Sequence, residues 1–228
     1  MSVEVAAGVV LIVAPLWFNT TFAMLGKQFD YPEILRRPSA EILERFRAGG
    51  SALILLWWAF MLSGLLLIAG AVLLGQALGF RGIVPVATTL GVLAGLVQML
   101  GLLRWVYVVP AIARDYADPT LGREQRDVHA AVFRTFHQYL GVGVGEHLGY
   151  LFTGIWSVLT GVGVIQGTAL PTWLGWPGVV IGVGLAVGSA EFLGPNEERG
   201  WGLAGSAIPI LYIAWSLWLL AMGIALIA

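Results

Sequence analysis

The sequence predicts an all-α protein, a polytopic transmembrane helical bundle of six spans. Of 228 residues, 58% are hydrophobic and only 11% are charged, whereas soluble domains carry roughly 25% charged residues. The charges are clustered, and five uncharged gaps between them are as long as the roughly 20 residues that cross a bilayer. Lys and Arg are also distributed unevenly among the short connecting segments. These three observations exclude a soluble globular enzyme.

Each span follows from an uncharged gap. The gaps 5–26, 48–80, 82–103 and 200–228 each fit one helix. The gap 148–190 fits two helices, with a turn near Thr168–Trp176 where Pro171 and Pro177 flank glycine. We therefore predict one transmembrane domain over 1–228, with spans at about 5–25, 52–77, 84–109, 138–165, 177–194 and 204–227.

Two further segments have amphipathic patterns. In Ser39–Arg47, apolar residues recur at helical spacing after a Pro-Ser start signal, which predicts a helix lying along the lipid headgroups. In Arg123–Tyr139, polar and apolar residues also separate onto two sides. This second segment is either another interfacial helix or an extension of the fourth span.

The distribution of basic residues predicts the orientation. The segments after spans one, three and five hold ten basic residues, and the segments on the opposite side hold only Arg81. The ten are Lys27, Arg36, Arg37, Arg45, Arg47, Arg114, Arg123, Arg126, Arg134 and Arg199. Basic residues in short loops are retained in the cytoplasm. Both termini are therefore predicted to lie outside the cytoplasm. The first apolar segment is expected to stay as a span, because no basic residue precedes it.

Small residues form a ridge along the fourth span. Glycine is unusually frequent, at 31 residues, and the small residues of this span recur every four positions: Gly141, Gly145, Gly149, Thr153, Ser157 and Gly161. Such ridges let helix backbones approach closely in lipid. The ridge therefore predicts tight packing within the bundle, with a functional hinge as the alternative.

Glu146 is the leading candidate for a functional site, because it falls inside the fourth span. An ionised carboxylate at the middle of a span costs roughly 2.5 to 3.5 kcal/mol or more, so it should face the interior, be protonated or have a partner. On an α-helix, Tyr139 would lie about 20° and Tyr150 about 40° from it in projection. Glu146 is either a proton or ligand site flanked by these phenols, or a neutral hydrogen-bonding group in the packing.

The histidines suggest a metal or haem site, but their spacing disfavours one. His137 and His147 are ten residues apart, about 80° and two to three turns on one α-helix, which is too far to bind one metal ion. No other span contains His, and a haem between helices takes its axial ligands from facing helices. We expect no metal, and haem remains a disfavoured alternative.

Arg104 and Gln98 are further candidate residues, and both lie in the third span. Arg104 is either the counter-ion of Glu146 or, with Trp105 as an anchor, an interfacial residue whose side chain reaches toward water. The interfacial interpretation is slightly favoured. Glu191, near the end of the fifth span, is likewise expected at the interface.

Two segments resemble a known family. They are Arg104–Trp105 with the following Pro110–Ala113, and the longer His137–Trp156, HQYLGVGVGEHLGYLFTGIW. Both are similar to segments in a family of bacterial polytopic membrane proteins of about six spans that is known only as a domain of unknown function. The resemblance covers most of the chain and implies a multi-pass protein of the bacterial inner membrane. It implies no activity, substrate or cofactor.

Three classes of function are compatible with the sequence. The leading one is a proton-linked or small-molecule binding or transport bundle around Glu146. The second is an anchor or assembly subunit of a larger membrane complex, or a homo-oligomer, and the third is a membrane enzyme acting on a lipid-soluble substrate. The lipid bilayer is the expected partner. The net charge of -1 gives no basic surface for nucleic acid.

Overall fold

The computed structural model describes residues 1–228, except for the side chain of Glu198. Within this description the chain folds into helices without a strand, and six of the helices are long and apolar enough to cross a membrane. The predicted all-α membrane bundle is therefore confirmed.

The six spans are built from helices that in three cases continue through a 3-10 or π segment. The elements of the first three spans are α1 (Val3–Phe29), the 3-10 turn η1 (Glu33–Arg36), α2 (Ser39–Ala77), α3 (Val84–Leu103), the π-helix η2 (Arg104–Val108) and α4 (Val109–Tyr116). The elements of the last three are α5 (Arg123–Phe136), the π-helix η3 (His137–Leu148), α6 (Gly149–Ile165), η4 (Thr172–Leu174), α7 (Gly175–Gly188), η5 (Ser189–Phe192), α8 (Pro195–Arg199) and α9 (Gly202–Ile227).

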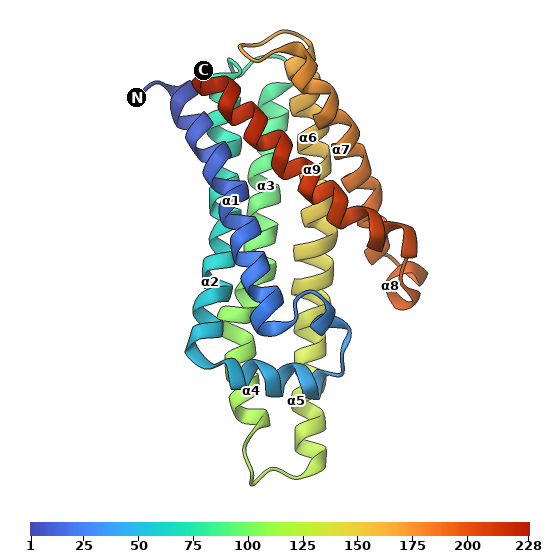
Figure 1. Ribbon diagram of the computed structural model, residues 1–228. Helices are drawn as coiled ribbons and strands as arrows, with labels where there is room; N and C mark the ends of the chain where they lie inside the picture. The colour runs from blue at the N-terminus through green and yellow to red at the C-terminus, as the bar shows by residue number, and fades with distance from the viewer.

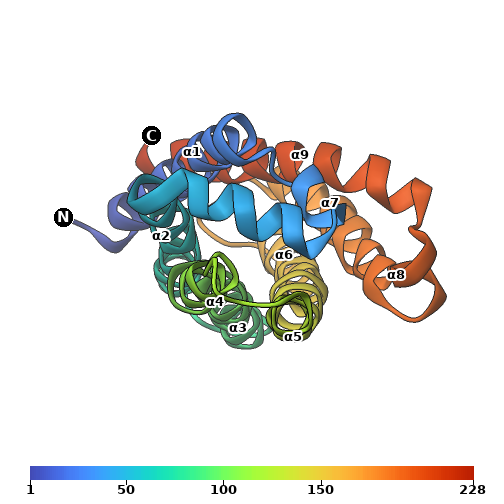
Figure 2. The same ribbon diagram turned by 90° about the horizontal axis from the view of Figure 1, so that it is seen from below.

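The bundle places both termini at one end (Figure 1). The α4–α5 connection and the start of α2 lie toward the opposite end, where the basic segments gather. Seen from that end, α1 and α9 form one side of the bundle, and α2, α3, α6 and α7 lie behind them (Figure 2). An even number of spans brings the termini together in this way.

A sharp bend divides α2 at Gly50. Its backbone has φ 55° and ψ -152°, a conformation that is open essentially to glycine alone. The bend lets residues 39–49 run across the bundle while residues 51–77 run along it (Figure 1).

The amphipathic segment Ser39–Arg47 is helical, but its apolar side does not face lipid. Ile42, Leu43 and Phe46 are at most 2% exposed. They belong to a hydrophobic cluster that includes Phe29, Trp105 and Phe133 of other elements. The apolar side of this helix therefore packs on the end of the bundle, which supplies a protein surface for it.

The second amphipathic segment extends the fourth span. α5 passes through η3 into α6 without a break. At its start Gly122 donates its backbone N–H to Gln125 Oε1 at 2.9 Å, which closes the first turn. Of the two alternatives, the structure has the extension.

Two hydrophobic clusters follow one another along the bundle. One, on the side of the termini, includes Leu11, Ala94 and Trp156. The other, on the side of the basic segments, includes Leu25 and Trp105. The first four spans each contribute to one cluster with one part of their length and to the other with another part, so that the residues between lie at an intermediate depth, whereas α7 and α9 contribute only to the cluster on the side of the termini.

Candidate functional site

Polar side chains occupy the depth between the two hydrophobic clusters. On α2, Ser63 falls between Phe60 of one cluster and Leu67 of the other; on α3, Gln98 falls between Ala94 and Trp105. On the fourth span, Glu146, Tyr150 and Thr153 fall between Phe133 and Trp156 in the same way. The candidate site is therefore part of a polar layer inside the bundle.

Arg104 is buried in the bundle, with 4% of its surface exposed. Its Nη1 donates to the carbonyl oxygen of Gly101, and its guanidinium lies 5.2 Å from the ring centre of Trp105. Its Nε has no hydrogen-bond partner, and no carboxylate among the described side chains lies within 4 Å of it. The expectation of an interfacial Arg104 that reaches water is thus wrong: α2 and the fourth span enclose it.

Trp105 is also buried rather than at the membrane interface. It is 0% exposed and stacks on Trp57, with ring centres 4.6 Å apart and an interplanar angle of 9°. The cluster formed with Phe29 and Phe46 explains why the ring does not face lipid.

Glu146 lies on the π-helix η3 and is half-buried. It lies near enough for its charge to interact with that of Arg104 and, at longer range, with Glu191 and Arg36. No hydrogen bond or ion pair of its carboxylate occurs within the described part of the chain. Glu146 and Arg104 therefore face one site without forming a direct salt bridge.

The π-helical geometry changes which residues accompany Glu146. A π-helix bonds residue i to i+5, so it turns less per residue than the α-helix assumed from the sequence. Tyr139 consequently lies outside the site and is 69% exposed. Tyr150 does lie inside, half-buried, with its ring 5.2 Å from Tyr212 and 5.3 Å from Phe192.

Tyr31 reaches the same region from the segment after α1. Its ring packs edge-on against Trp57 at 5.1 Å and Phe22 at 5.3 Å. Burial raises the pKa of the Tyr31 phenol, and the Glu146 carboxylate raises this pKa further, whereas Arg104 acts in the opposite direction. The Tyr31 phenol is therefore neutral, and the charges of Glu146 and Arg104 both act on it.

Glycines of the small-residue ridge bring the fourth span against α3. A Cβ at Gly101 would lie 2.5 Å from the Gly145 Cα, and a Cβ at Gly141 would lie 2.6 Å from the Arg104 guanidinium. Gly149 packs on Gln98, whose amide donates to Thr153 Oγ1 at 3.0 Å. This part of the ridge thus serves packing around the site.

The ridge turns toward another neighbour further along. A Cβ at Gly161 would lie 2.4 Å from the Gly175 carbonyl oxygen, so Gly161 packs on α7 and not on α3. Residues four apart on an α-helix are displaced by about 40° around its axis. A four-residue repeat therefore winds around α6 and meets different helices at its two ends.

His147 and Glu191 connect η5 to the site. His147 Nδ1 lies 2.9 Å from the carbonyl oxygen of Ser189. Glu191 is 8% exposed, and its carboxylate lies 3.7 Å from the Arg36 guanidinium, whose side chain is 80% exposed. The Glu191 carboxylate is therefore enclosed by protein, while its basic partner faces outward.

His137 lies at the edge of the site, near Arg104, and not with His147. Its ring stacks on Phe133 at 5.6 Å, and its Nδ1 is buried without a partner. The two histidines thus point to different neighbours. Over the described residues, no group of three or more His, Asp or Glu side chains is arranged to hold a metal ion.

Sequence reasoning missed Tyr31, Tyr212, Glu191 and Thr153 as members of the site. Tyr31 lies more than 100 residues from Glu146, and Tyr212 lies more than 60 residues from it. Tyr31 stands in a polar connecting segment, and Tyr212 and Thr153 in apolar segments resemble ordinary packing residues, so no local pattern marks them. Only the buried charge of Glu191 offered a signal, and its place near a span end concealed it.

Comparison with known proteins gives the family and no more. A family model described as a domain of unknown function, DUF4386, matches residues 6–223, nearly the whole chain. No curated protein and no solved structure matches the sequence. The matched segment contains the polar layer, the two π-helices, four whole spans and most of the first and last. The chain is a polytopic membrane helical bundle that belongs to the DUF4386 family, a domain of unknown function.

Proposed function

We propose that this protein is a proton-linked binding or transport bundle, in which Glu146 exchanges a proton under the influence of Arg104. The observation that carries the proposal is the buried Arg104, 4% exposed and without a carboxylate within 4 Å in the described part of the chain. A buried charge without a close partner is strongly unfavourable for stability. Charged residues inside spans accordingly mark ion, proton or substrate pathways.

Two π-helices meeting at the site support the same conclusion. η2 begins at Arg104, and η3 carries Glu146. π-helical turns are rare and frequently occur at functional sites. They also allow the charged groups of the two helices to face one interior without the regular spacing of an α-helix.

Close packing limits what the site accepts in this conformation. Gly141 lies directly against the Arg104 guanidinium, and Gly145 against the backbone of Gly101. A proton fits such a site, whereas a larger ligand requires α3 and η3 to separate. The charged and titratable groups that surround Glu146 are those whose charges act on it or respond to it: Arg104, Arg36, Glu191, Tyr31, Tyr150 and Tyr212.

The test compares the pH dependence of wild type, Glu146→Gln and Glu44→Gln in mild detergent. Thermal unfolding and tryptophan emission, to which the buried Trp57–Trp105 pair contributes, are followed from about pH 5 to 9. We expect a wild-type transition that Glu146→Gln abolishes and that Glu44→Gln, an exposed carboxylate, retains. Mass spectrometry of small molecules that copurify identifies any bound ligand.

Identical pH profiles for wild type and Glu146→Gln, with unaltered ligand content, contradict the proposal. Assembly with a partner subunit gains no specific support from the small-residue ridge, because Gly145 and Gly161 are used in contacts within the chain.

A further inference from the structure

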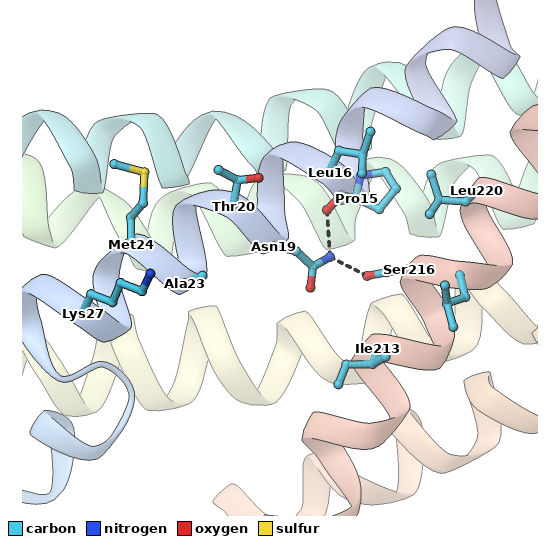
Figure 3. A pocket seen from close by; sticks show the side chains of 11 residues that line it. Pro15, Leu16, Asn19, Thr20, Ala23, Met24, Lys27, Ile213, Ser216 and Leu220 are labelled. Atoms are coloured by element: carbon cyan, nitrogen blue, oxygen red, sulfur yellow. Dashed lines mark hydrogen bonds between the residues drawn. The ribbon is translucent and has the colours of Figure 1, made fainter.

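A groove of about 570 Å³ lies between α1 and α9, and none of the candidate-site residues lines it. Its volume is in the roughly 300–1,000 Å³ range of small-molecule sites. It is lined by two stripes at helical spacing, and Figure 3 shows most of their side chains: Pro15, Leu16, Asn19, Thr20, Ala23, Met24 and Lys27 on α1, and Ile213, Ser216, Leu217 and Leu220 on α9.

The groove follows from the way in which α1 and α9 cross. Gly8 and Gly223 touch near the termini: a Cβ at Gly8 would lie 2.7 Å from the Gly223 carbonyl oxygen. From this contact the helices diverge toward the opposite end (Figure 1). Asn19 Nδ2 bridges them by donating to Ser216 Oγ at 2.9 Å and to the Pro15 carbonyl oxygen at 2.7 Å (Figure 3).

The dimensions and charge of the groove match one leaflet of a bilayer. Pro15 and Lys27 are twelve residues apart, which is about 18 Å along a helix. Half of a bilayer with its headgroups is roughly 20 Å thick. The lining is mostly apolar over this length, and the ammonium group of Lys27 stands at the end that reaches the basic side of the bundle.

Lys27 is free to bind an anion. It is exposed, and no ion pair engages it among the side chains that the structure describes. The neighbouring basic residues Arg37 and Arg45 instead pair with Asp30. An unpaired cation at the headgroup end of an apolar groove attracts a negatively charged headgroup.

We propose that the groove between α1 and α9 binds an anionic phospholipid, with an acyl chain against Ala23 and Asn19 and the phosphate at Lys27. The site is independent of Glu146, so the two proposals can fail separately.

The experiment measures which lipids the full chain retains. Protein is reconstituted in vesicles of equimolar phosphatidylcholine and phosphatidylglycerol, extracted mildly, and analysed by native mass spectrometry. We expect the retained lipid to be enriched in phosphatidylglycerol about fivefold over the vesicle, the factor that corresponds to about 1 kcal/mol for one basic residue at an anionic surface. Lys27→Gln should remove the enrichment, whereas Arg47→Gln, an exposed cation outside the groove, should keep it.

A second pair of variants tests the groove itself. Ala23→Phe fills it and should reduce retained lipid of both kinds, whereas Ser206→Phe, which enlarges a small side chain at an exposed position of α9 outside the groove, should not. Far-UV circular dichroism confirms that each variant is folded. Any of three results overturns the proposal. They are lipid retained in the same ratio as in the vesicle, enrichment of phosphatidylglycerol that survives Lys27→Gln, and lipid retention that Ala23→Phe leaves unchanged. A wild-type dimer without lipid also overturns it, since a second copy would then fill the groove.

Discussion

At the scale of the residue, Arg104 is a cation held in the bundle by its stem and by its neighbours rather than by a matching carboxylate. Its guanidinium packs against Gly141 and Trp105. Replacing a buried ion pair with apolar side chains of similar size is often neutral or stabilising, by about 1–4 kcal/mol in some proteins, and Arg104 has no close ion-pair partner that its replacement would leave uncompensated. The charge is therefore more important for the electrostatics of the site than for folding.

We expect Arg104→Met to leave the free energy of unfolding within about 1 kcal/mol of wild type or to increase it. The same variant should shift the pH midpoint of the unfolding transition that depends on Glu146, because it removes the Arg104 charge that acts on the Glu146 carboxylate. Thermal unfolding across pH measures both effects. Arg123→Met, at an exposed position of α5, is the control and should change neither. A strongly destabilised Arg104→Met would show instead that the charge holds the fold together.

At the scale of the element, the contact of α3 with η3 depends on glycine because the two backbones nearly touch. Gly101 and Gly145 face one another with no space for a side chain. A Cβ at Gly143, on the same π-helix as Gly145, would instead lie 3.6 Å from its nearest neighbour, an ordinary van der Waals distance. Gly101 and Gly143 therefore form a matched pair, because both lie in helices but only Gly101 faces a closely packed backbone.

Gly101→Ala should lower stability by about 1–3 kcal/mol, the usual cost of inserting a methyl group into a well-packed contact. Gly143→Ala should have little effect or a slightly stabilising one, because alanine favours helix. Thermal or denaturant unfolding in detergent compares the two. Equal melting temperatures for both variants would mean that α3 and η3 are not in contact at this point.

At the scale of the whole molecule, the six helices put both termini at one end and the basic segments at the other. The bundle thus has a marked charge asymmetry along its axis. If the basic end is cytoplasmic, as basic residues in short loops require, the termini lie outside the cytoplasm.

Fusion reporters measure this orientation directly. A reporter that is active only outside the cytoplasm should work after Ala228 and fail when inserted at Asp118, in the α4–α5 connection. A reporter that is active only inside should show the reverse pattern. Activity of one reporter at both positions is incompatible with the three spans between Asp118 and Ala228, and the opposite pattern at both positions reverses the orientation.

The sequence determined the spans because bilayer thickness fixes the length of an uncharged helix, and this constraint is local. The predicted 84–109 and 204–227 lie within Val84–Tyr116 and Gly202–Ile227 for that reason. The sequence also placed Glu146 within the fourth span, since it is surrounded by apolar sequence.

Only the tertiary structure decided what Glu146 meets. The π-helical turn moves Tyr139 outward, and Arg104 is buried where Gly141 of the fourth span packs on its guanidinium. Tyr31 and Tyr212 join the site from distant segments. Such contacts depend on how helices cross and bend, as at Gly50 and between Gly8 and Gly223. Crossing and bending are set by packing between segments remote in the chain, which composition and local spacing do not record.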